Sequence, residues 1–284
     1  MTQQEARLGI QFSDIPDKVS DDALAYAASY VIGLVRFDRN DGQLMGSGTL
    51  VRVGKNSGIL TARHVLDGFP DTGEIGLILP KPNQENSRAM KPVIRVETTK
   101  RHTFPLGARE CDGPDLAFLE LATYDVEKIE ASKSFYPLDL FREEILADQS
   151  NFSGRAFILT GFPDEMTKRH YFPEGQQLVM KFTGGLYLSQ IQHLPDANSF
   201  DYVDLSVWHD QEKPPPRSFG GYSGGGLWHL QMRGNTASEL ELAKCTLFGV
   251  AFYQSGIVDG FSRIRCHFRR SVYEQLFNKV VGST

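Results

Sequence analysis

Residues 31–62 read VIGLVRFDRNDGQLMGSGTLVRVGKNSGILTA, and this stretch decides the fold class. It opens with the β-branched and aromatic run Val31–Phe37, a composition typical of strands. Asn40-Asp41-Gly42 predicts a hairpin turn, and Lys55-Asn56-Ser57-Gly58 predicts a second one. The stretch therefore predicts successive short strands joined by tight turns, with a further strand at Ile59–Ala62.

The same pattern of short β-rich runs separated by turn residues continues through most of the chain. Its 27 Gly and 19 Phe suit a turn-rich β protein. The further predicted strands are Gly76–Leu79, Val93–Val96, Asp115–Leu121, Arg155–Thr160, Leu178–Thr183, Tyr202–Val207, Gly225–His229 and Thr246–Tyr253. Short strands at this spacing predict a mainly β protein, with an antiparallel barrel or a sandwich as the candidate architectures.

The 284 residues read as one domain, 1–284, built from two β units at roughly 30–125 and 153–265. The segment 125–153 between the units has few strand signals and some helical character around Leu140–Asp148. We therefore interpret this segment as a linker.

A helix is predicted at each end of the chain. Near the N-terminus, Ser20 is the expected N-cap of a helix that runs to about Tyr30. Residues 267–281 predict an amphipathic C-terminal helix, because apolar residues recur every four positions from Phe268 to Val280.

Charge and cysteine content narrow the class of protein. The chain has 30 Lys+Arg and 35 Asp+Glu, a formal net charge of −5, which argues against nucleic acid as the main partner. It has neither a signal-peptide pattern nor an apolar run of membrane-spanning length, so we expect a cytoplasmic protein that uses no membrane. Cys111, Cys245 and Cys266 form no CxxC pair, which disfavours a zinc ribbon or a disulfide framework.

Three short segments carry residues suited to nucleophilic catalysis: LTARHV at 60–65, GPDLAFL at 113–119 and GGYSGGG at 220–226. A hydroxyl that attacks an amide needs a base, an acid to orient that base, and donors for the oxyanion. Ser223, His64 and Asp115 would supply the three side chains. The backbone N–H groups of Gly221 and Ser223 would form the oxyanion hole, since neighbouring glycines tolerate the backbone angles required.

Each segment also has a purely structural interpretation. A histidine at a strand end is most often a hydrogen-bonded structural residue, an Asp before a strand often caps a turn, and glycines suit tight loops. Asp112 competes with Asp115, and Ser218 competes with Ser223 but lacks flanking glycines. The remaining histidines show no metal-ligand spacing, so no metal site is predicted. The arginines within 263–270 indicate a solvated face, with a nucleic-acid patch as the alternative.

Together the three segments resemble the trypsin-like serine peptidases of the chymotrypsin fold. Members of that family carry TA-x-H around the base, D-hydrophobic-A around the acid and G-x-S-G-G around the nucleophile. This chain has Thr61-Ala62-Arg63-His64, Asp115-Leu116-Ala117 and Gly221-Tyr222-Ser223-Gly224-Gly225, in the family's order. Gly46-Ser47-Gly48-Thr49-Leu50 and Gly161-Phe162-Pro163 match two further family patterns. The resemblance covers about 30–280 and implies two packed six-stranded antiparallel β-barrels with the catalytic cleft between them.

Two departures from the secreted members of that family are informative. Tyr222 stands where those members carry the Asp that binds a newly cleaved N-terminus, so this activation switch is expected to be absent. No cysteine lies near His64, so the disulfide around the base is absent as well.

The resemblance also implies a specificity pocket. Arg217 would lie near its base, with Phe252, Tyr253 and Gln254 along its wall. An arginine there would favour an acidic substrate side chain, because a guanidinium pairs strongly with a shielded carboxylate. The alternative is that Arg217, beside three prolines, is an exposed loop residue.

The sequence therefore predicts a serine endopeptidase that cleaves protein or peptide substrates through an acyl-enzyme, with His64 as base, Asp115 as orienting acid and Ser223 as nucleophile. No cofactor is expected, and a regulatory protein partner remains an open question. Two other interpretations stay open: a protease-like binding or scaffold module with little turnover, and an esterase that uses the same triad.

Overall fold

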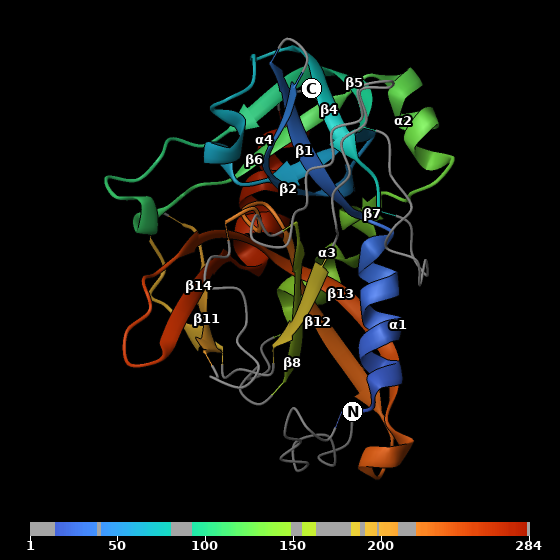
Figure 1. The fold of residues 1–284 in the computed structure, drawn as a ribbon, viewed down its shortest axis with the longest axis vertical. Coiled ribbons are helices and arrows are strands. Elements are labelled where there is room, and N and C mark those ends of the chain that lie inside the picture. Colours follow the sequence, from blue (N-terminus) through green and yellow to red (C-terminus); the bar gives the residue numbers. More distant parts are fainter. Residues whose placement is uncertain are drawn as a thin grey trace.

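The computed structural model describes residues 15–38, 41–80, 93–148, 155–162, 183–187, 191–197, 199–209 and 220–282. Arg217 and Ser218 lie outside the described residues, as does most of the strand predicted at Leu178–Thr183. The described residues form two β assemblies, drawn one above the other in Figure 1, with helices along their flanks.

The N-terminal assembly is a closed barrel. Its strands are β1 (Val31–Asp38), β2 (Asp41–Val53), β3 (Asn56–Thr61), β4 (Gly73–Ile78), β5 (Val93–Thr103), β6 (Ala117–Leu121) and β7 (Tyr136–Pro137). The antiparallel order is β1-β4-β5-β6-β3-β2, and pairing of β1 with β2 closes the ring of six strands. The short β7 adds a parallel pairing on β2. The predicted β class and the first barrel are therefore confirmed.

The second assembly is a seven-stranded sheet with the order β10-β11-β14-β13-β12-β8-β9. Its strands are β8 (Ala156–Gly161), β9 (Thr183–Tyr187), β10 (Gln192–His193), β11 (Tyr202–Trp208), β12 (Gly226–Arg233), β13 (Glu241–Gln254) and β14 (Phe261–His267). All of its pairings are antiparallel. Within the described residues no pairing closes this sheet into the second barrel that the resemblance implies.

A fully buried tryptophan joins the two assemblies. Trp228 of β12 lies with its ring 5.4 Å from that of Tyr136 in β7, and 5.5 Å from that of Tyr30, which precedes β1. Its indole N–H donates to Thr160 Oγ1 of β8 at 3.1 Å. The largest hydrophobic cluster accordingly contains residues of both assemblies, so their packed sides form one continuous core.

The helices differ from the predictions at their boundaries. Helix α1 (Asp17–Ala28) begins after Pro16, which suits a helix start because proline lacks an N–H; the predicted cap at Ser20 is wrong, since Ser20 lies in the first turn. The predicted linker contains α2 (Thr123–Glu130) and α3 (Leu138–Ala147) as well as β7. At the C-terminus, strand β14 continues through His267, and helix starts only with a π-helical segment, Ser271–Leu276, followed by α4 (Phe277–Val281).

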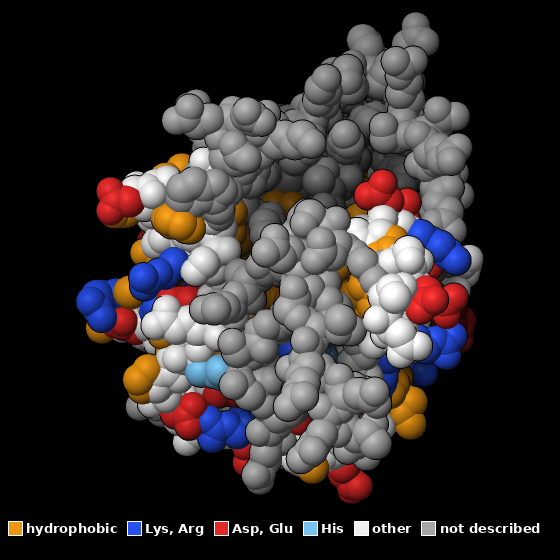
Figure 2. All heavy atoms as spheres, turned by 90° about the horizontal axis from the view of Figure 1, so that it is seen from below, with side chains coloured by type: hydrophobic (Ala, Val, Ile, Leu, Met, Phe, Trp, Pro, Cys, Tyr) orange, Lys and Arg blue, Asp and Glu red, His pale blue; other side chains and the backbone are white. Residues whose placement is uncertain are grey.

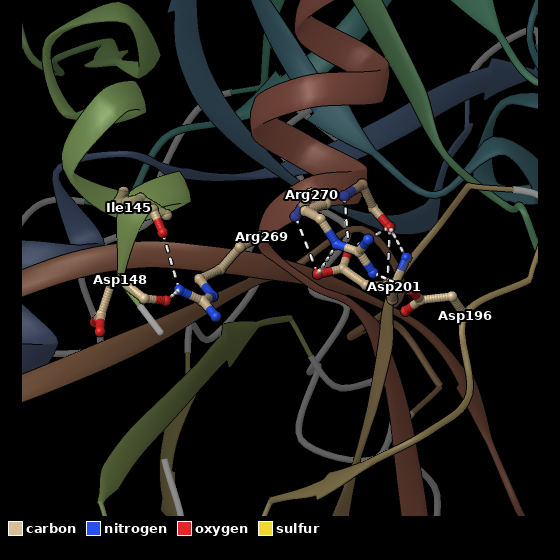
Figure 3. A network of polar contacts seen from close by, with 7 residues as sticks. Ile145, Asp148, Asp196, Asp201, Arg269 and Arg270 are labelled. Atoms are coloured by element: carbon tan, nitrogen blue, oxygen red, sulfur yellow. Dashed lines mark hydrogen bonds and ion pairs between the residues drawn. The ribbon is translucent and has the colours of Figure 1, made fainter. Parts of the chain in front are cut away.

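An aspartate far away in sequence caps this C-terminal helix, as Figure 3 shows. The Asp201 carboxylate accepts the backbone N–H of Arg270 at 3.0 Å and that of Ser271 at 2.6 Å. The Ser271 hydroxyl also donates to the Asp201 carbonyl at 2.8 Å. Because the first N–H groups of a helix lack partners within it, these bonds anchor the helix start next to β11 and the end of β14.

Candidate active site

His64 and Asp115 meet because their strands are neighbours in the barrel. Strand β3 pairs with β6 in antiparallel register, with Thr61 opposite Ala117. His64 follows the end of β3 in a 3₁₀ turn, Arg63–Leu66, and Asp115 directly precedes the start of β6. Two residues 51 positions apart in sequence therefore lie at the same end of the strand pair.

The Asp115 carboxylate contacts His64 with both of its oxygens. Oδ1 accepts the backbone N–H of His64 at 2.9 Å, and Oδ2 lies 2.5 Å from the ring nitrogen Nδ1. The Asp115 side chain is 7% exposed, whereas that of His64 is 40% exposed. The acceptor opposite Nδ1 assigns the proton to that nitrogen, so the neutral imidazole has its lone pair at Nε2. His64 is thereby arranged to accept a proton at Nε2.

The environment of His64 shifts its pKa upward. Burial lowers the pKa by disfavouring the charged ring, but the hydrogen bond that His64 donates to Asp115 and the negative charge of Asp115 outweigh that effect. The charges of Asp67 and Glu110 act in the same direction as Asp115. The imidazolium form of His64 is therefore stabilised in the folded protein.

The turn that carries Ser223 depends on glycine. Gly221 and Gly224 have φ angles of 87° and 86°, in the left-handed region that favours glycine. A Cβ on Gly224 would lie 2.0 Å from the Ser47 carbonyl oxygen, and one on Gly225 would lie 1.9 Å from that of Thr160. Strand β2 and strand β8 thus pack directly against the backbone of the turn.

Two backbone donors of this turn have no acceptor. Within the described ranges, the N–H groups of Gly221 and Ser223 make no hydrogen bond. By contrast, the N–H of Gly224 donates to the Ala251 carbonyl at 2.8 Å, and that of Gly225 to the Tyr222 carbonyl at 2.7 Å. In the described part of the chain, the two donors expected to bind an oxyanion are therefore available for a ligand.

Ser47 of β2 holds the turn from the barrel side. Its backbone N–H donates to the Ser223 carbonyl at 2.8 Å, and its hydroxyl donates to the Gly221 carbonyl at 2.5 Å. The same hydroxyl accepts the N–H of Phe162 at 2.9 Å, and the Ser47 carbonyl accepts from Thr61 Oγ1 at 2.7 Å. Ser47 is fully buried, so it joins β3, β8 and the glycine turn at a place that excludes water.

Gly46 separates Ser223 from the turn that contains His64. A Cβ built on Gly46 would lie 3.0 Å from the Ser223 carbonyl oxygen and 2.8 Å from Val65 Cγ2. Ser223 and the residue after His64 therefore flank one glycine. Between these two described residues, Ser223 and His64, no hydrogen bond links hydroxyl and imidazole.

Comparison with known proteins adds no family to this geometry. Neither the family models nor the curated proteins include a match to the chain.

The residues predicted for the pocket wall have different surroundings. Phe252 is 3% exposed and its ring packs 4.6 Å from that of His267 and 5.8 Å from that of Tyr202. Tyr253 and Gln254 are partly buried at the end of β13. Their role in a pocket, like that of Arg217, stays a prediction.

The competing aspartate is engaged elsewhere. Asp112 receives two hydrogen bonds from the Arg109 guanidinium, at 2.9 and 2.8 Å. That hydrogen bond is the main reason why the pKa of Asp112 lies below its ordinary value. Of the two aspartates, Asp115 is the one that contacts His64.

Arginines of the basic run 263–270 make ion pairs and hydrogen bonds with other segments of the chain. Arg265 pairs with Asp204, Arg270 pairs with Asp196, and Arg269 donates to the Ile145 carbonyl (Figure 3). Figure 2 shows acidic and basic side chains intermixed on the described part of one face.

Among the described residues, no group of three or more His, Cys, Asp or Glu side chains is placed to hold a metal ion. Of the helices in that part of the chain, none combines the length and apolarity needed to cross a bilayer.

Two residues that contact the site were missed by the sequence analysis. The sequence indicates Ser47 only as part of a glycine motif, and His267 only as one of the histidines without metal-ligand spacing and as the first residue of a predicted helix. The Nε2 atom of His267 accepts the backbone N–H of Asp115 at 3.1 Å. Strand β14 reads FSRIRCH, with polar and apolar residues alternating, so the local sequence does not single out His267.

Proposed function

We propose that the protein is a serine endopeptidase of the trypsin-like type, which cleaves peptide bonds in protein substrates. The observation that carries the proposal is the double contact of Asp115 with the backbone and ring N–H groups of His64. A carboxylate that orients a histidine through Nδ1 leaves Nε2 to act as base, which is the role of the histidine in a Ser-His-Asp triad. The unused donors of Gly221 and Ser223 support the same chemistry.

In this mechanism, Ser223 Oγ attacks the carbonyl carbon of the scissile bond and its proton moves to His64 Nε2. The carbonyl oxygen gains the electron pair of the broken π bond and is held by the N–H groups of Gly221 and Ser223. The tetrahedral intermediate expels the amine, which takes the proton from His64, and leaves an acyl-enzyme. Water then attacks the ester with His64 again as base, the bond from the acyl carbon to Ser223 Oγ breaks, and Oγ takes the proton back from His64. Asp115 stays ionised and stabilises the imidazolium throughout.

The missing contact between Ser223 and His64 is compatible with this mechanism. Catalytic hydrogen bonds are often long or misaligned without substrate and tighten in the complex. The Ser223 carbonyl and Val65, the residue after His64, both lie against Gly46, so the two turns are neighbours in the fold.

We further propose that the second sheet belongs to the second barrel implied by the resemblance. Its antiparallel order and its position against the first barrel support this view. Arg217 as a pocket residue remains part of the proposal, tested by comparing peptide-library profiles of the unaltered protein and Arg217→Ala. Loss of an acidic preference in the variant supports the assignment, and an unchanged profile opposes it.

The decisive experiment for the function is labelling with a fluorophosphonate probe, which reacts with activated serine hydroxyls. We expect labelling of the unaltered protein and of Ser218→Ala, and none of Ser223→Ala. Absence of labelling in the folded, unaltered protein would favour the scaffold interpretation. Where labelling occurs, cleavage of casein separates an endopeptidase from an esterase that turns over only ester substrates.

A further inference from the structure

His267 is held rigidly in the middle of the second sheet. It is the last residue of β14, opposite Tyr202 of β11 on one side and Val250 of β13 on the other. It is fully buried, and its ring lies among those of Phe252, Tyr202 and Phe200, at 4.6, 5.1 and 5.8 Å between ring centres. The capped start of the C-terminal helix follows four residues later, which fixes the chain beyond the strand.

The imidazole of His267 reaches across to the other assembly. Its Nε2 accepts the backbone N–H of Asp115 at 3.1 Å. An imidazole nitrogen can accept only when it carries no proton, so the bond requires the neutral ring with its proton on Nδ1. Burial lowers the pKa of His267 to about 3, which keeps the ring neutral at physiological pH. The titratable residues next to it are Asp115, whose charge acts on the ring, and Tyr202, whose ring packs against it.

Burying a histidine at this position costs folding free energy. Among the described residues, Nδ1 of His267 is buried without a hydrogen-bond partner. A buried donor left without an acceptor costs free energy, and an apolar ring of similar size would fit these aromatic surroundings without that cost. The hydrogen bond accepted at Nε2 is the favourable interaction that such an apolar ring could not make.

Asp115 is consequently hydrogen-bonded through its side chain and through its backbone. Its carboxylate contacts two N–H groups of His64, and its backbone N–H donates to His267. The strand next to His267 leads to the nucleophile: Val250 pairs with His267, and the carbonyl of the next residue, Ala251, accepts the N–H of Gly224. One short path of contacts therefore connects Ser223's turn, through β13 and β14, to Asp115 and His64.

We propose that His267 is a positioning residue, whose neutral imidazole fixes Asp115, and through it His64, relative to the sheet that carries Ser223. Its consequence for catalysis rests on the proposed function. Its consequence for the His64–Asp115 pair does not, because that pair exists in the structure whatever reaction it serves.

The test replaces the acceptor and keeps the ring. His267→Phe removes Nε2, and His267→Gln offers a carbonyl oxygen in its place. The matched control is His229→Phe, since His229 is a second buried histidine of the same sheet, packed between Phe157 and Phe248. If His267→Phe does not fold, His267→Met asks the same question with a flexible apolar side chain.

The first measurement is the pKa of His64, followed by NMR on protein with ¹⁵N-labelled histidine. We expect His267→Phe to lower the pKa of His64 towards the ordinary value and to weaken the downfield signal of its Nδ1 proton. His229→Phe should leave both unchanged, and His267→Gln should restore both in part. The charges that face His64 are Asp115, Asp67 and Glu110, and none of the variants removes them.

The second measurement is the rate of fluorophosphonate labelling. We expect a loss of about ten- to hundredfold in His267→Phe, the size of effect that a small misplacement of catalytic groups produces. A folded His267→Phe with the His64 pKa and labelling rate of the unaltered protein overturns the proposal. If the unaltered protein is not labelled at all, the proposed function fails, and the NMR comparison still decides the role of His267.

Discussion

The hydroxyl of Ser47 donates to the carbonyl of Gly221 across 2.5 Å and thereby joins barrel strand β2 to the glycine turn of the second assembly. Because the same hydroxyl also accepts the N–H of Phe162, one buried atom orients two segments. The peptide that follows the Gly221 carbonyl leads into Tyr222 and Ser223, so the orientation of that carbonyl affects the nucleophile directly.

We expect Ser47→Ala to destabilise the fold and slow the chemistry. The variant leaves the Phe162 N–H and the Gly221 carbonyl without their buried partner, which should cost about 1–3 kcal/mol of unfolding free energy. Urea unfolding measures this loss. The exposed Ser238→Ala is the control and should change stability by less than about 0.5 kcal/mol. Equal stability of the two variants would contradict the assigned role of Ser47.

We expect the three proposed catalytic side chains to act as one unit. Ser223→Ala, His64→Ala and Asp115→Asn should each reduce turnover by about 10⁴-fold or more while the protein stays folded. Combining two of them should add little, because a triad that has lost one member has lost its mechanism. Peptidase assays of single and double variants, with circular dichroism as the check on folding, measure this. Near-normal activity in a folded His64→Ala would refute the assignment.

The rate of labelling should rise with pH through the pKa of His64. Only the neutral imidazole can accept the Ser223 proton, and the balance of burial against the Asp115 interactions raises the pKa of His64 above the ordinary value of about 6.5. The inflection is therefore expected above that value. A pH–rate profile on the unaltered protein measures it, and Asp115→Asn should move the inflection down. An inflection well below pH 6 in the unaltered protein would count against His64 as the base.

Buried histidines should make the fold acid-sensitive. Burial lowers the pKa of His229 and of His267 to about 3, whereas an unfolded histidine titrates near about 6.5. Between these values the unfolded chain binds more protons than the folded one, so stability is complete above about pH 6.5 and falls as the pH decreases. Each histidine should contribute roughly 1–2 kcal/mol per pH unit in that window. Urea unfolding from pH 7 to 4.5 should show a shallower decline in folded His229→Phe, and an identical slope would disprove the contribution of His229.

Activity should not require cleavage of the N-terminus. Tyr222, at the position before the nucleophile, is 2% exposed, and burial raises the pKa of its hydroxyl further above the ordinary value. A neutral phenol cannot form the ion pair that a carboxylate would make with a newly formed amino group. Intact-mass analysis of the fluorophosphonate-labelled protein checks this, since the labelled species should include the full 284-residue chain. Labelling confined to trimmed molecules would show that processing is needed.

Local pattern predicted those features that depend on neighbours in sequence. The strands around Thr61 and Ala117 follow from short β-rich runs between turns, and their register places His64 beside Asp115. Contacts between distant segments left no such pattern. The partners of the Ser47 hydroxyl are 115 and 174 residues away, and the partner of the His267 imidazole is 152 residues away. A serine between glycines and a histidine at a strand end are too common to identify such roles.

Helix boundaries show a related limit. The C-terminal apolar pattern runs on from β14 into the helix, so periodicity alone could not separate strand from helix at His267. The residue that fixes the boundary is Asp201, whose carboxylate binds the N–H groups of Arg270 and Ser271 from another strand's start. Tertiary contacts therefore determine where strand β14 ends and the C-terminal helix begins, because such contacts commonly override local propensity.

The packing of helix α1 has a consequence for the order in which the protein matures on the ribosome. Helix α1 ends at Ala28 but packs against β13, which begins at Glu241, more than 200 residues later. At a synthesis rate of about 5–20 residues per second, the helix waits about 10–40 s for the surface that covers it. Until then, of the strands that contact α1, only β1 and later β8 are available to cover its apolar side, which includes Val19, Ala23 and Ala27. During this interval the nascent chain therefore exposes apolar helix surface to which chaperones can bind.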